Sequence, residues 1–245
     1  DCDVIAGLHS FLAEDPELAS LAAEHDAELR DLRRPPEDLT VADGTAGGVD
    51  ADVVLTVGTD CSSGKMTASY ELRDAARERG IDAAVVPTGQ TGVLIEGWGI
   101  VVDRVIADFA AGAVERLVER AAPDHDLLIV EGQGALGHPA YSGVTTSILH
   151  GARPDALVLC HVAGRTAVHG YEETAISPVG DYADLYERVA APVRASEVVA
   201  GMYNTQSLDE AAAERAVEAY ADDLGVPATD PVRFGVGERL LEALP

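Results

Sequence analysis

The chain has 245 residues, 47% of them hydrophobic, and its 43 acidic against 17 basic residues give a formal net charge of −26. This acidity argues against nucleic acid or an anionic membrane as a partner, because both require clustered Lys and Arg. The hydrophobic content can form a sizeable core, which argues against disorder. No apolar run reaches the ~20 residues of a membrane helix and no secretory segment opens the chain, so we expect a cytoplasmic protein that acts on a small molecule.

Lysine and cysteine usage adds two further expectations. Sixteen of the 17 basic residues are arginine, and Lys65 is the only lysine. A net charge of this size repels itself in ordinary buffer, whereas at about 1 M salt a Debye length of ~3 Å screens most of the repulsion. The composition therefore predicts a halophilic protein. Cys2, Cys61 and Cys160 are odd in number and widely spaced, which predicts free thiols rather than disulfides or a zinc site.

The N-terminal part is predicted to be separate from the rest. Residues 7–25 have a helical pattern, in which Asp15, Pro16 and Glu17 supply an N-cap, a first-turn proline and an acidic first turn. Small and polar residues at 43–50 indicate a linker, so we place a domain boundary near residue 50. The chain begins with Asp1 rather than Met, and we therefore expect an N-terminal portion to be missing.

From residue 50 onward, short apolar runs alternate with helical patterns. The predicted strands are Val53–Val57, Ala83–Val86, Leu127–Val130, Ala156–Cys160 and Val198–Met202. The predicted helices are residues 64–79, 99–121, 144–151, 181–190 and 207–224. Buried strands separated by helices are typical of parallel sheets with crossover connections. The sequence therefore predicts a three-layer α/β domain with a mostly parallel sheet.

The joint between the first predicted strand and the first predicted helix has the composition of a phosphate-binding loop. Its residues are Gly58, Thr59, Asp60, Cys61, Ser62, Ser63, Gly64, Lys65, Met66 and Thr67. Loop amides and a helix N-terminus would converge there on an anion, with Lys65 beside it. The usual pattern has four residues before Gly-Lys and a hydroxyl for magnesium after it, whereas this chain has five and places Met66 at the hydroxyl position. The alternative is an ordinary strand-turn-helix joint with Gly64 serving close packing.

A carboxylate is predicted to face the same crevice. Glu131 ends the apolar run 127–130 and is followed by glycines. In an open parallel sheet, ligands bind beyond the carboxyl ends of the strands. Glu131 could hold a metal such as Mg²⁺ or accept a proton as a general base. The alternative is that it caps the next turn through backbone amides.

Five further residues are candidates for binding the substrate. Gln90, Thr91 and Gly92 follow the second predicted strand and could hold a carboxylate through amides and hydroxyls, or form a plain turn. Arg153 and Arg165 flank a predicted strand, and a guanidinium fork suits a dicarboxylate. Alternatively, either arginine neutralises local acidic charge.

Histidine and cysteine offer weaker candidates. His161 at a strand end could act as a general base near neutral pH or be satisfied by the backbone. His138 and His169 lie in predicted loops and are weaker still. Cys61 could be an activated thiol at a helix N-terminus, although a packing role in the loop is the preferred interpretation.

Several of these motifs resemble known enzymes. Gly-Thr-Asp followed by Gly-Lys, Val-Glu-Gly-Gln-Gly and a Pro-containing loop at residues 87–92 resemble the dethiobiotin-synthetase group of phosphate-loop enzymes. A closer resemblance is to a less-studied family with five motifs, all of which are present from residue 50 onward. They are Gly-Thr-Asp-Cys at 58–61, Gly-Lys-Met-Thr at 64–67, Gly-Gln-Thr-Gly at 89–92, Val-Glu-Gly-Gln-Gly at 130–134 and His-Gly-Ala-Arg-Pro-Asp at 150–155.

This resemblance implies a fold and an activity. Members of the family have been labelled D-glutamate N-acetyltransferases, and others carry an epimerase or dehydratase label that these motifs do not support. Fuller chains have a Rossmann-like part before the phosphate-loop part. The resemblance thus implies that residues 1–49 are the remnant of a Rossmann-like domain plus linker and that residues 50–245 are a P-loop NTPase-like α/β domain. Related synthetases place an Asn against the nucleotide base, which implies a base-binding role for Asn204.

Three functions remain open from the sequence. The first is a transferase that moves acetyl from acetyl-CoA to an acidic amino acid such as D-glutamate, with the loop holding the donor's pyrophosphate and Glu131 or His161 as the base. Met66 fits this anchoring role better than phosphoryl transfer. The second is an ATP-dependent ligase or kinase with Mg²⁺ near Glu131, and the third is a non-catalytic nucleotide-binding module. We also expect a homo-oligomer.

Overall fold

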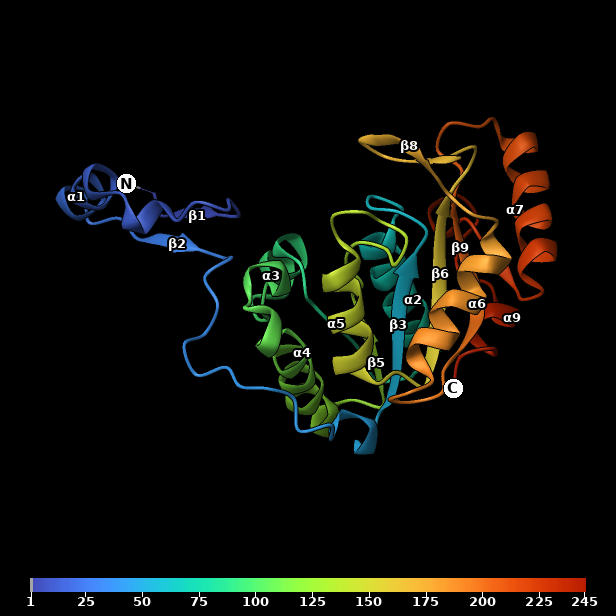
Figure 1. The fold of residues 1–245 in the computed structure, drawn as a ribbon, viewed down its shortest axis with the longest axis horizontal. Helices are drawn as coiled ribbons and strands as arrows, with labels where there is room; N and C mark the ends of the chain where they lie inside the picture. Colours follow the sequence, from blue (N-terminus) through green and yellow to red (C-terminus); the bar gives the residue numbers. More distant parts are fainter. Residues whose placement is uncertain (1) are drawn as a thin grey trace.

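The centre of the molecule is a six-stranded parallel sheet. The computed structural model describes residues 2–245, and the strand order is β10-β9-β6-β3-β5-β4 (Figure 1). The strands are β3 (Asp52–Gly58), β4 (Ala83–Val86), β5 (Leu127–Val130), β6 (Ala156–Val162), β9 (Glu197–Asn204) and β10 (Ala228–Thr229). All five predicted strands are confirmed. Each is a mostly apolar run because a parallel strand with helices on both faces of the sheet is buried on both sides.

Helices cover both faces of this sheet, which confirms the three-layer α/β prediction (Figure 1). The helices are α2 (Lys65–Glu78), α3 (Gln90–Glu96), α4 (Ala107–Ala121), α5 (Ser142–Ala152), α6 (Val179–Ala190), α7 (Glu210–Leu224), α8 (Pro231–Phe234) and α9 (Glu238–Leu241). Alternate strand residues face opposite layers. Val53 and Leu55 belong to the core with α4, α5 and α6, whereas Val54 packs with α2 and α9. No helix among residues 2–245 is long and apolar enough to cross a membrane.

Two predicted helices are too long. The helix predicted at 99–121 begins only at Ala107, because Gly99 has a φ of +124° and a 3-10 turn, η3 (Val102–Arg104), follows it. The helix predicted at 7–25 is confined to α1 (Pro16–Glu24). Its predicted N-cap is confirmed, since the Asp15 carboxylate accepts hydrogen bonds from the amides of Glu17 and Leu18. The remaining 3-10 turns are η1 (Leu12–Glu14), η2 (Ala46–Gly48) and η4 (Ala122–Asp124).

Residues 2–35 form an arm that projects from the body (Figure 1). It contains α1 and two short parallel strands, β1 (Val4–Ala6) and β2 (Leu29–Asp31). Buried Arg33 fastens the arm to the body: it donates a 2.7 Å hydrogen bond to the carbonyl of Gly7 and forms an ion pair with Asp103 of η3. The sequence alone did not reveal these strands, because neither is a long apolar run.

The connection between arm and sheet is held against α4 by one carboxylate. Glu115 is buried and accepts hydrogen bonds from the amides of Asp43, Thr45 and Ala46 at 2.6, 2.7 and 3.3 Å. Leu39 and Ala46 are part of the main core. Residues 39–46 therefore pack as part of the body.

Replacing Gly132 by Ala is expected to destabilise the protein by at least ~2 kcal/mol, because overpacking a closed site forces the backbone apart. A Cβ at this position would lie 1.8 Å from the carbonyl oxygen of Thr56. The matched control is Gly143→Ala in α5, where a Cβ meets nothing within 4 Å and alanine favours the helix by about 0.5–1 kcal/mol. Urea unfolding in molar KCl measures both changes, and equal stabilities of the two variants would contradict this account.

Candidate phosphate site and its surroundings

The loop at residues 58–67 joins β3 to α2 at the carboxyl edge of the sheet. Lys65 begins α2, is 6% exposed, and its Nζ donates to the carbonyl of Asp60 at 2.8 Å and to Oγ of Ser63 at 3.3 Å. Gly64 before it has a φ of +98°, a conformation that favours glycine. Burial lowers the pKa of Lys65. The ammonium of Lys65 thus lies within the loop and donates hydrogen bonds to two of its oxygens.

Two adjoining pockets open beside the loop. The first, of about 400 Å³, is lined by residues 61–67, by residues 131–134 and by Asn204. The second, of about 500 Å³, is lined by Ser63, Gly64, Thr67, Ala68, Met202, Tyr203, Asn204, Gln206, Asp230, Pro231, Val232 and Arg233. They share four residues, which are Ser63, Gly64, Thr67 and Asn204. A ligand with phosphates over the loop could therefore extend a larger group into the second pocket.

Glu131 lies at the end of β5, beside this loop. It is 3% exposed, and its Oε2 accepts hydrogen bonds from the amides of Thr88 at 3.3 Å and Gly89 at 3.2 Å. Burial raises the pKa of Glu131, against the opposing effect of these hydrogen bonds, of Gln133 and of the Lys65 charge. The alternative prediction was that Glu131 caps the turn that follows it through backbone amides. Glu131 does accept backbone amides, but they belong to Thr88 and Gly89, in the segment after β4. The carboxyl group is thus held under the N-terminus of α3, in the wall of the first pocket.

Asp60 is the centre of a hydrogen-bonded cluster in the first half of the loop. Its carboxylate is fully buried and accepts from the amide of Cys61 at 2.7 Å, the guanidinium of Arg165 at 3.0 Å and the amide of His169 at 2.9 Å. Arg165 also donates to the carbonyl of Cys61 at 2.8 Å. These contacts fasten the phosphate loop to the hairpin of β7 (Ala167–Val168) and β8 (Tyr171–Ala175).

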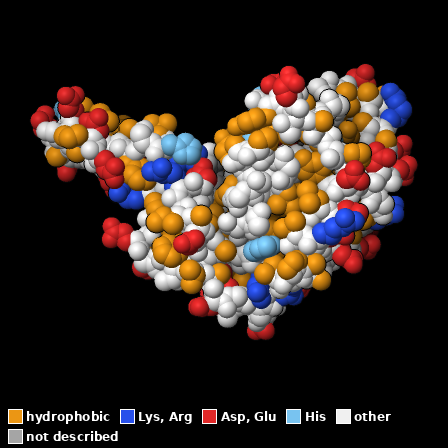
Figure 2. Space-filling view, in the orientation of Figure 1, with side chains coloured by type: hydrophobic (Ala, Val, Ile, Leu, Met, Phe, Trp, Pro, Cys, Tyr) orange, Lys and Arg blue, Asp and Glu red, His pale blue; other side chains and the backbone are white. Residues whose placement is uncertain are grey.

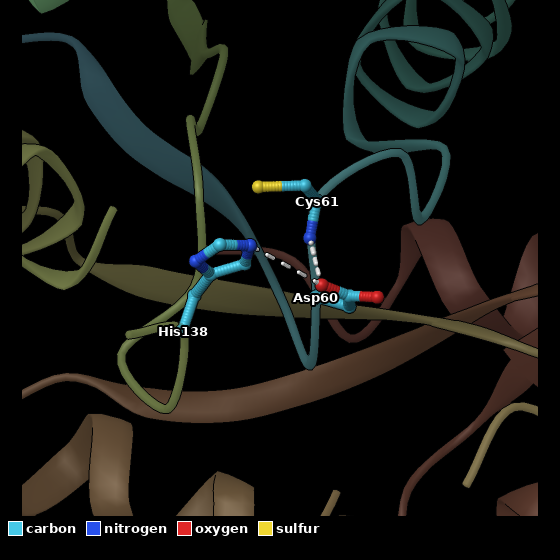
Figure 3. A group of neighbouring side chains, drawn as sticks. All are labelled: Asp60, Cys61 and His138. Atoms are coloured by element: carbon cyan, nitrogen blue, oxygen red, sulfur yellow. Dashed lines mark hydrogen bonds and ion pairs between the residues drawn. The ribbon is translucent and has the colours of Figure 1, made fainter. Parts of the chain in front are cut away.

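Asp60, Cys61 and His138 bring three potential metal-ligating atoms within 4.8 Å of one another (Figure 3). The amide of Ala140 donates to Nδ1 of His138 at 3.1 Å, so in a neutral ring the proton is on Nε2. Nε2 is the nitrogen that faces Asp60, 4.0 Å from its Oδ1. A metal would require a free lone pair on that nitrogen, and both Asp60 oxygens already accept N–H groups. The cluster therefore fits a hydrogen-bonded support of the loop and does not fit a metal site.

His161 lies on β6 directly behind the loop. Its Nδ1 is 2.7 Å from the hydroxyl of Thr59, and its ring stacks on Tyr203 with centroids 5.7 Å apart. Burial, and then the charge of Arg165, lower the pKa of His161 to about 4. A neutral imidazole with such a low pKa is a weak proton acceptor near pH 7. Of the two predicted bases, Glu131 is the one that lines the first pocket.

Comparison with known proteins identifies the family. A domain of unknown function described as a P-loop domain, DUF1611_C, matches residues 40–241, and a Rossmann-like domain of unknown function, DUF1611_N, matches residues 1–35. The chain belongs to the DUF1611 family. The crystal structure of a DUF1611 family protein from Anabaena variabilis superposes with a TM-score of 0.94 at 42% identity, covering 98% of this chain and 70% of that one.

Two curated relatives carry the same descriptive name. Proteins called D-glutamate N-acetyltransferase from a Pseudoalteromonas species and from Tritonibacter scottomollicae are each 40% identical to this chain. The matches cover 96% and 99% of this chain and 70% and 72% of the relatives. The predicted family resemblance is thus confirmed, together with the P-loop domain and the preceding Rossmann-like part.

The structure brings together most of the residues that the sequence predicts for the site, but it places Arg153 elsewhere. Arg153 follows α5 and lies just before β6, whose first residue, Ala156, pairs with Val54 near the start of β3. The loop with Lys65 follows the other end of β3. The predicted role of Arg153 in the substrate site is therefore wrong, and its guanidinium lies against Gly44 instead.

Arg165 and the segment after β4 have structural contacts that the sequence did not reveal. Arg165 is bound to the loop itself, through Asp60 and the carbonyl of Cys61. Gln90, Thr91 and Gly92 form the first turn of α3 rather than a plain turn. A Cβ on Gly92 would lie 2.4 Å from Oε2 of Glu131, so glycine is required for the carboxylate to fit.

Asn204 lies where the two pockets meet, as a base-binding residue would. Its Oδ1 accepts the amide of Gln206 at 3.1 Å, which leaves its side-chain amide N–H groups as donors. Asp230 in the pocket wall was not predicted, and its carboxylate is occupied by the amides of Thr205, Val232 and Arg233. Its only sequence signal was the Asp-Pro pair that opens α8.

Proposed function

We propose that this protein is an N-acetyltransferase that moves the acetyl group of acetyl-CoA to the amine of an acidic amino acid, with D-glutamate as the first substrate to test. The observation that carries the proposal is a phosphate loop around Lys65 that has Met66 in place of the magnesium-binding hydroxyl. Such a loop suits a ligand whose phosphates are anchored but not transferred. The names of the two curated relatives support the same activity.

The loop would hold the donor by its pyrophosphate. The amides of residues 58–67, the N-terminus of α2 and the ammonium of Lys65 supply donors and positive charge for one diphosphate. The adenine would enter the adjoining pocket of about 500 Å³, against Met202 and Val232, with the amide of Asn204 as a donor to a ring nitrogen. This arrangement uses both pockets for one donor molecule.

The transfer step requires a free amine and a base. The amine nitrogen attacks the thioester carbonyl, the carbon–sulfur bond breaks, and the CoA thiolate leaves and takes up a proton. Glu131 would accept the proton that the amine loses, because a carboxylate with a raised pKa is a better base than an exposed one. His161 is engaged with Thr59, and burial lowers its pKa to about 4, so we assign it a supporting role behind the loop.

An ATP-dependent ligase or kinase is the second candidate, and the position of Glu131 favours it. A buried carboxylate in the wall of the phosphate pocket could hold Mg²⁺. Met66 disfavours it, since the protein would have to replace the missing hydroxyl ligand with water.

Calorimetry and a turnover assay in molar KCl distinguish these functions. The protein is titrated with acetyl-CoA, CoA, ATP with Mg²⁺ and ATP alone, and product formation is followed with D- and L-glutamate. Binding of CoA without magnesium, together with N-acetylglutamate formation, is the expected result. Magnesium-dependent ATP binding without CoA binding would refute the acetyltransferase and favour the ligase.

A further inference from the structure

The junction between the N-terminal arm and the body gathers basic groups in an otherwise strongly acidic protein. Figure 2 shows arginine or lysine and histidine side chains side by side where the arm meets the body. The basic residues whose contacts lie at this junction are His9, Arg33, Arg34 and Arg104. His9 and Arg33 face Asp103, and Arg34 faces Glu14. The guanidinium of Arg104 is the further positive charge that could accept an anion here.

Two of these guanidinium groups are held in place by one aromatic ring. The Cζ atoms of Arg34 and Arg104 lie 4.5 and 5.0 Å from the ring centre of Phe11. Arg34 makes an ion pair with Glu14 at 3.1 Å, in which both side chains are largely exposed, and such a pair contributes little free energy. Within residues 2–245, Arg104 forms no ion pair with a carboxylate. Stacking on Phe11 leaves the N–H edge of Arg104 available to a ligand, whereas Arg34 would share its N–H groups between Glu14 and a ligand.

The junction is connected to Glu131 by a short series of contacts. Arg33 donates to the carbonyl of Gly7, and Gly7 packs so closely on Gln90 that a Cβ would lie 3.2 Å from its Cγ. Gln90 begins α3, and the amide of the preceding Gly89 donates to Glu131. One side of the α3 N-terminus thus contacts the arm, and the other contacts the carboxyl group that we propose as the base.

We propose that this junction binds the carboxylates of the acceptor amino acid, with Arg104 and Arg34 as the groups that recognise it. The proposal rests on the acetyltransferase function proposed above. Two guanidinium groups fixed on one ring suit a small dicarboxylate, because planar N–H pairs match carboxylate oxygens. Glutamate bound there would have its amine available toward α3 and Glu131.

The length of the donor supports a site away from the phosphate loop. In acetyl-CoA the pantetheine arm separates the thioester from the pyrophosphate, so a donor whose diphosphate lies over Lys65 does not present its acetyl group at the loop. Glu131 borders the loop pocket and also contacts the segment that leads to the junction.

Arg104→Ala tests the site by direct binding. The protein is saturated with CoA in molar KCl and titrated with D-glutamate and L-glutamate by calorimetry. Loss of one charged hydrogen-bonding partner should weaken glutamate binding at least ~10-fold, with CoA affinity unchanged, and should raise the KM for glutamate more than it lowers kcat. Arg104→Lys should recover part of the affinity. The matched control is Arg120→Ala, which removes an arginine stacked on Trp98 at 5.3 Å and should leave binding unchanged.

The outcomes separate this proposal from the proposed function. Wild-type glutamate affinity in both Arg104→Ala and Arg34→Ala would overturn the site, and so would a CoA-loaded wild-type protein that binds neither enantiomer. Glutamate binding that is lost in Arg104→Ala, in a protein that forms no acetylated product, would support the site and refute the acetyltransferase. Thermal unfolding of each variant shows whether the fold is intact.

Discussion

Lys65→Met is expected to weaken binding of the phosphate-bearing donor substantially while leaving the fold at least as stable as before. The Lys65 ammonium donates to the carbonyl of Asp60 and to the hydroxyl of Ser63 in the loop, and each hydrogen bond that a charged group makes contributes about 1.5–3 kcal/mol. A diphosphate that loses it should bind at least ~10-fold more weakly. Calorimetry with CoA, and with ATP in parallel, measures the loss.

The stability of this variant follows from the pKa of the lysine. Burial lowers the pKa of Lys65 below its ordinary 10.5, so the folded protein holds this proton less tightly than the unfolded chain does. Burying the charged ammonium therefore lowers the free energy of unfolding. This loss of stability is complete at pH values below the folded-state pKa and disappears as the pH rises toward 10.5. Methionine carries no charge and avoids this loss of stability, so the Tm of the variant at neutral pH should equal or exceed that of the wild type. Arg215→Met on exposed α7 controls for the loss of one charge, and full CoA affinity in Lys65→Met would refute the role of the loop.

The strands and the phosphate loop could be predicted because their signals are local. Each central strand is a continuous apolar run, and the loop combines glycines with Lys65, the only lysine, directly after such a run. The start of α4 could not be predicted in this way, because apolar residues 100–102 continue its pattern. Only the backbone of Gly99, at a φ of +124°, shows that the chain is irregular before Ala107.

The parts of the site that depend on distant contacts were not predictable. Asp60 was expected only as a member of the loop, whereas its partners Arg165 and His169 are more than 100 residues away in the sequence. The tautomer of His138 depends on one backbone amide, that of Ala140. Arg153 failed as a candidate because a strand has two ends, and the sequence motif that contains it does not show which end faces the ligand.

Glu131→Gln is expected to lower kcat by about 10²–10⁴-fold, the usual contribution of a general base, with little change in CoA affinity. The glutamine oxygen can still accept the amides of Thr88 and Gly89, so the N-terminus of α3 should stay in place. Burial raises the pKa of Glu131 above its ordinary 4.5. Wild-type activity should therefore fall as the pH drops through this raised pKa, and the variant should lose that acidic limb. The pH dependence of kcat measures the effect.

The same variant distinguishes a base from a metal ligand. If Glu131 holds Mg²⁺ for ATP, Glu131→Gln should weaken magnesium-dependent ATP binding and leave CoA binding unaffected. If it is the base, nucleotide and CoA affinities should stay unchanged while turnover falls. The free energy of unfolding tests the role of Glu131 independently of activity. A buried carboxyl group whose pKa is raised on folding destabilises the folded protein as the pH rises above 4.5. The glutamine variant should lack this loss, so its free energy of unfolding at pH 7 should equal or exceed that of the wild type. A large loss of stability at pH 7 would show instead that the ionised carboxylate holds the α3 N-terminus in place.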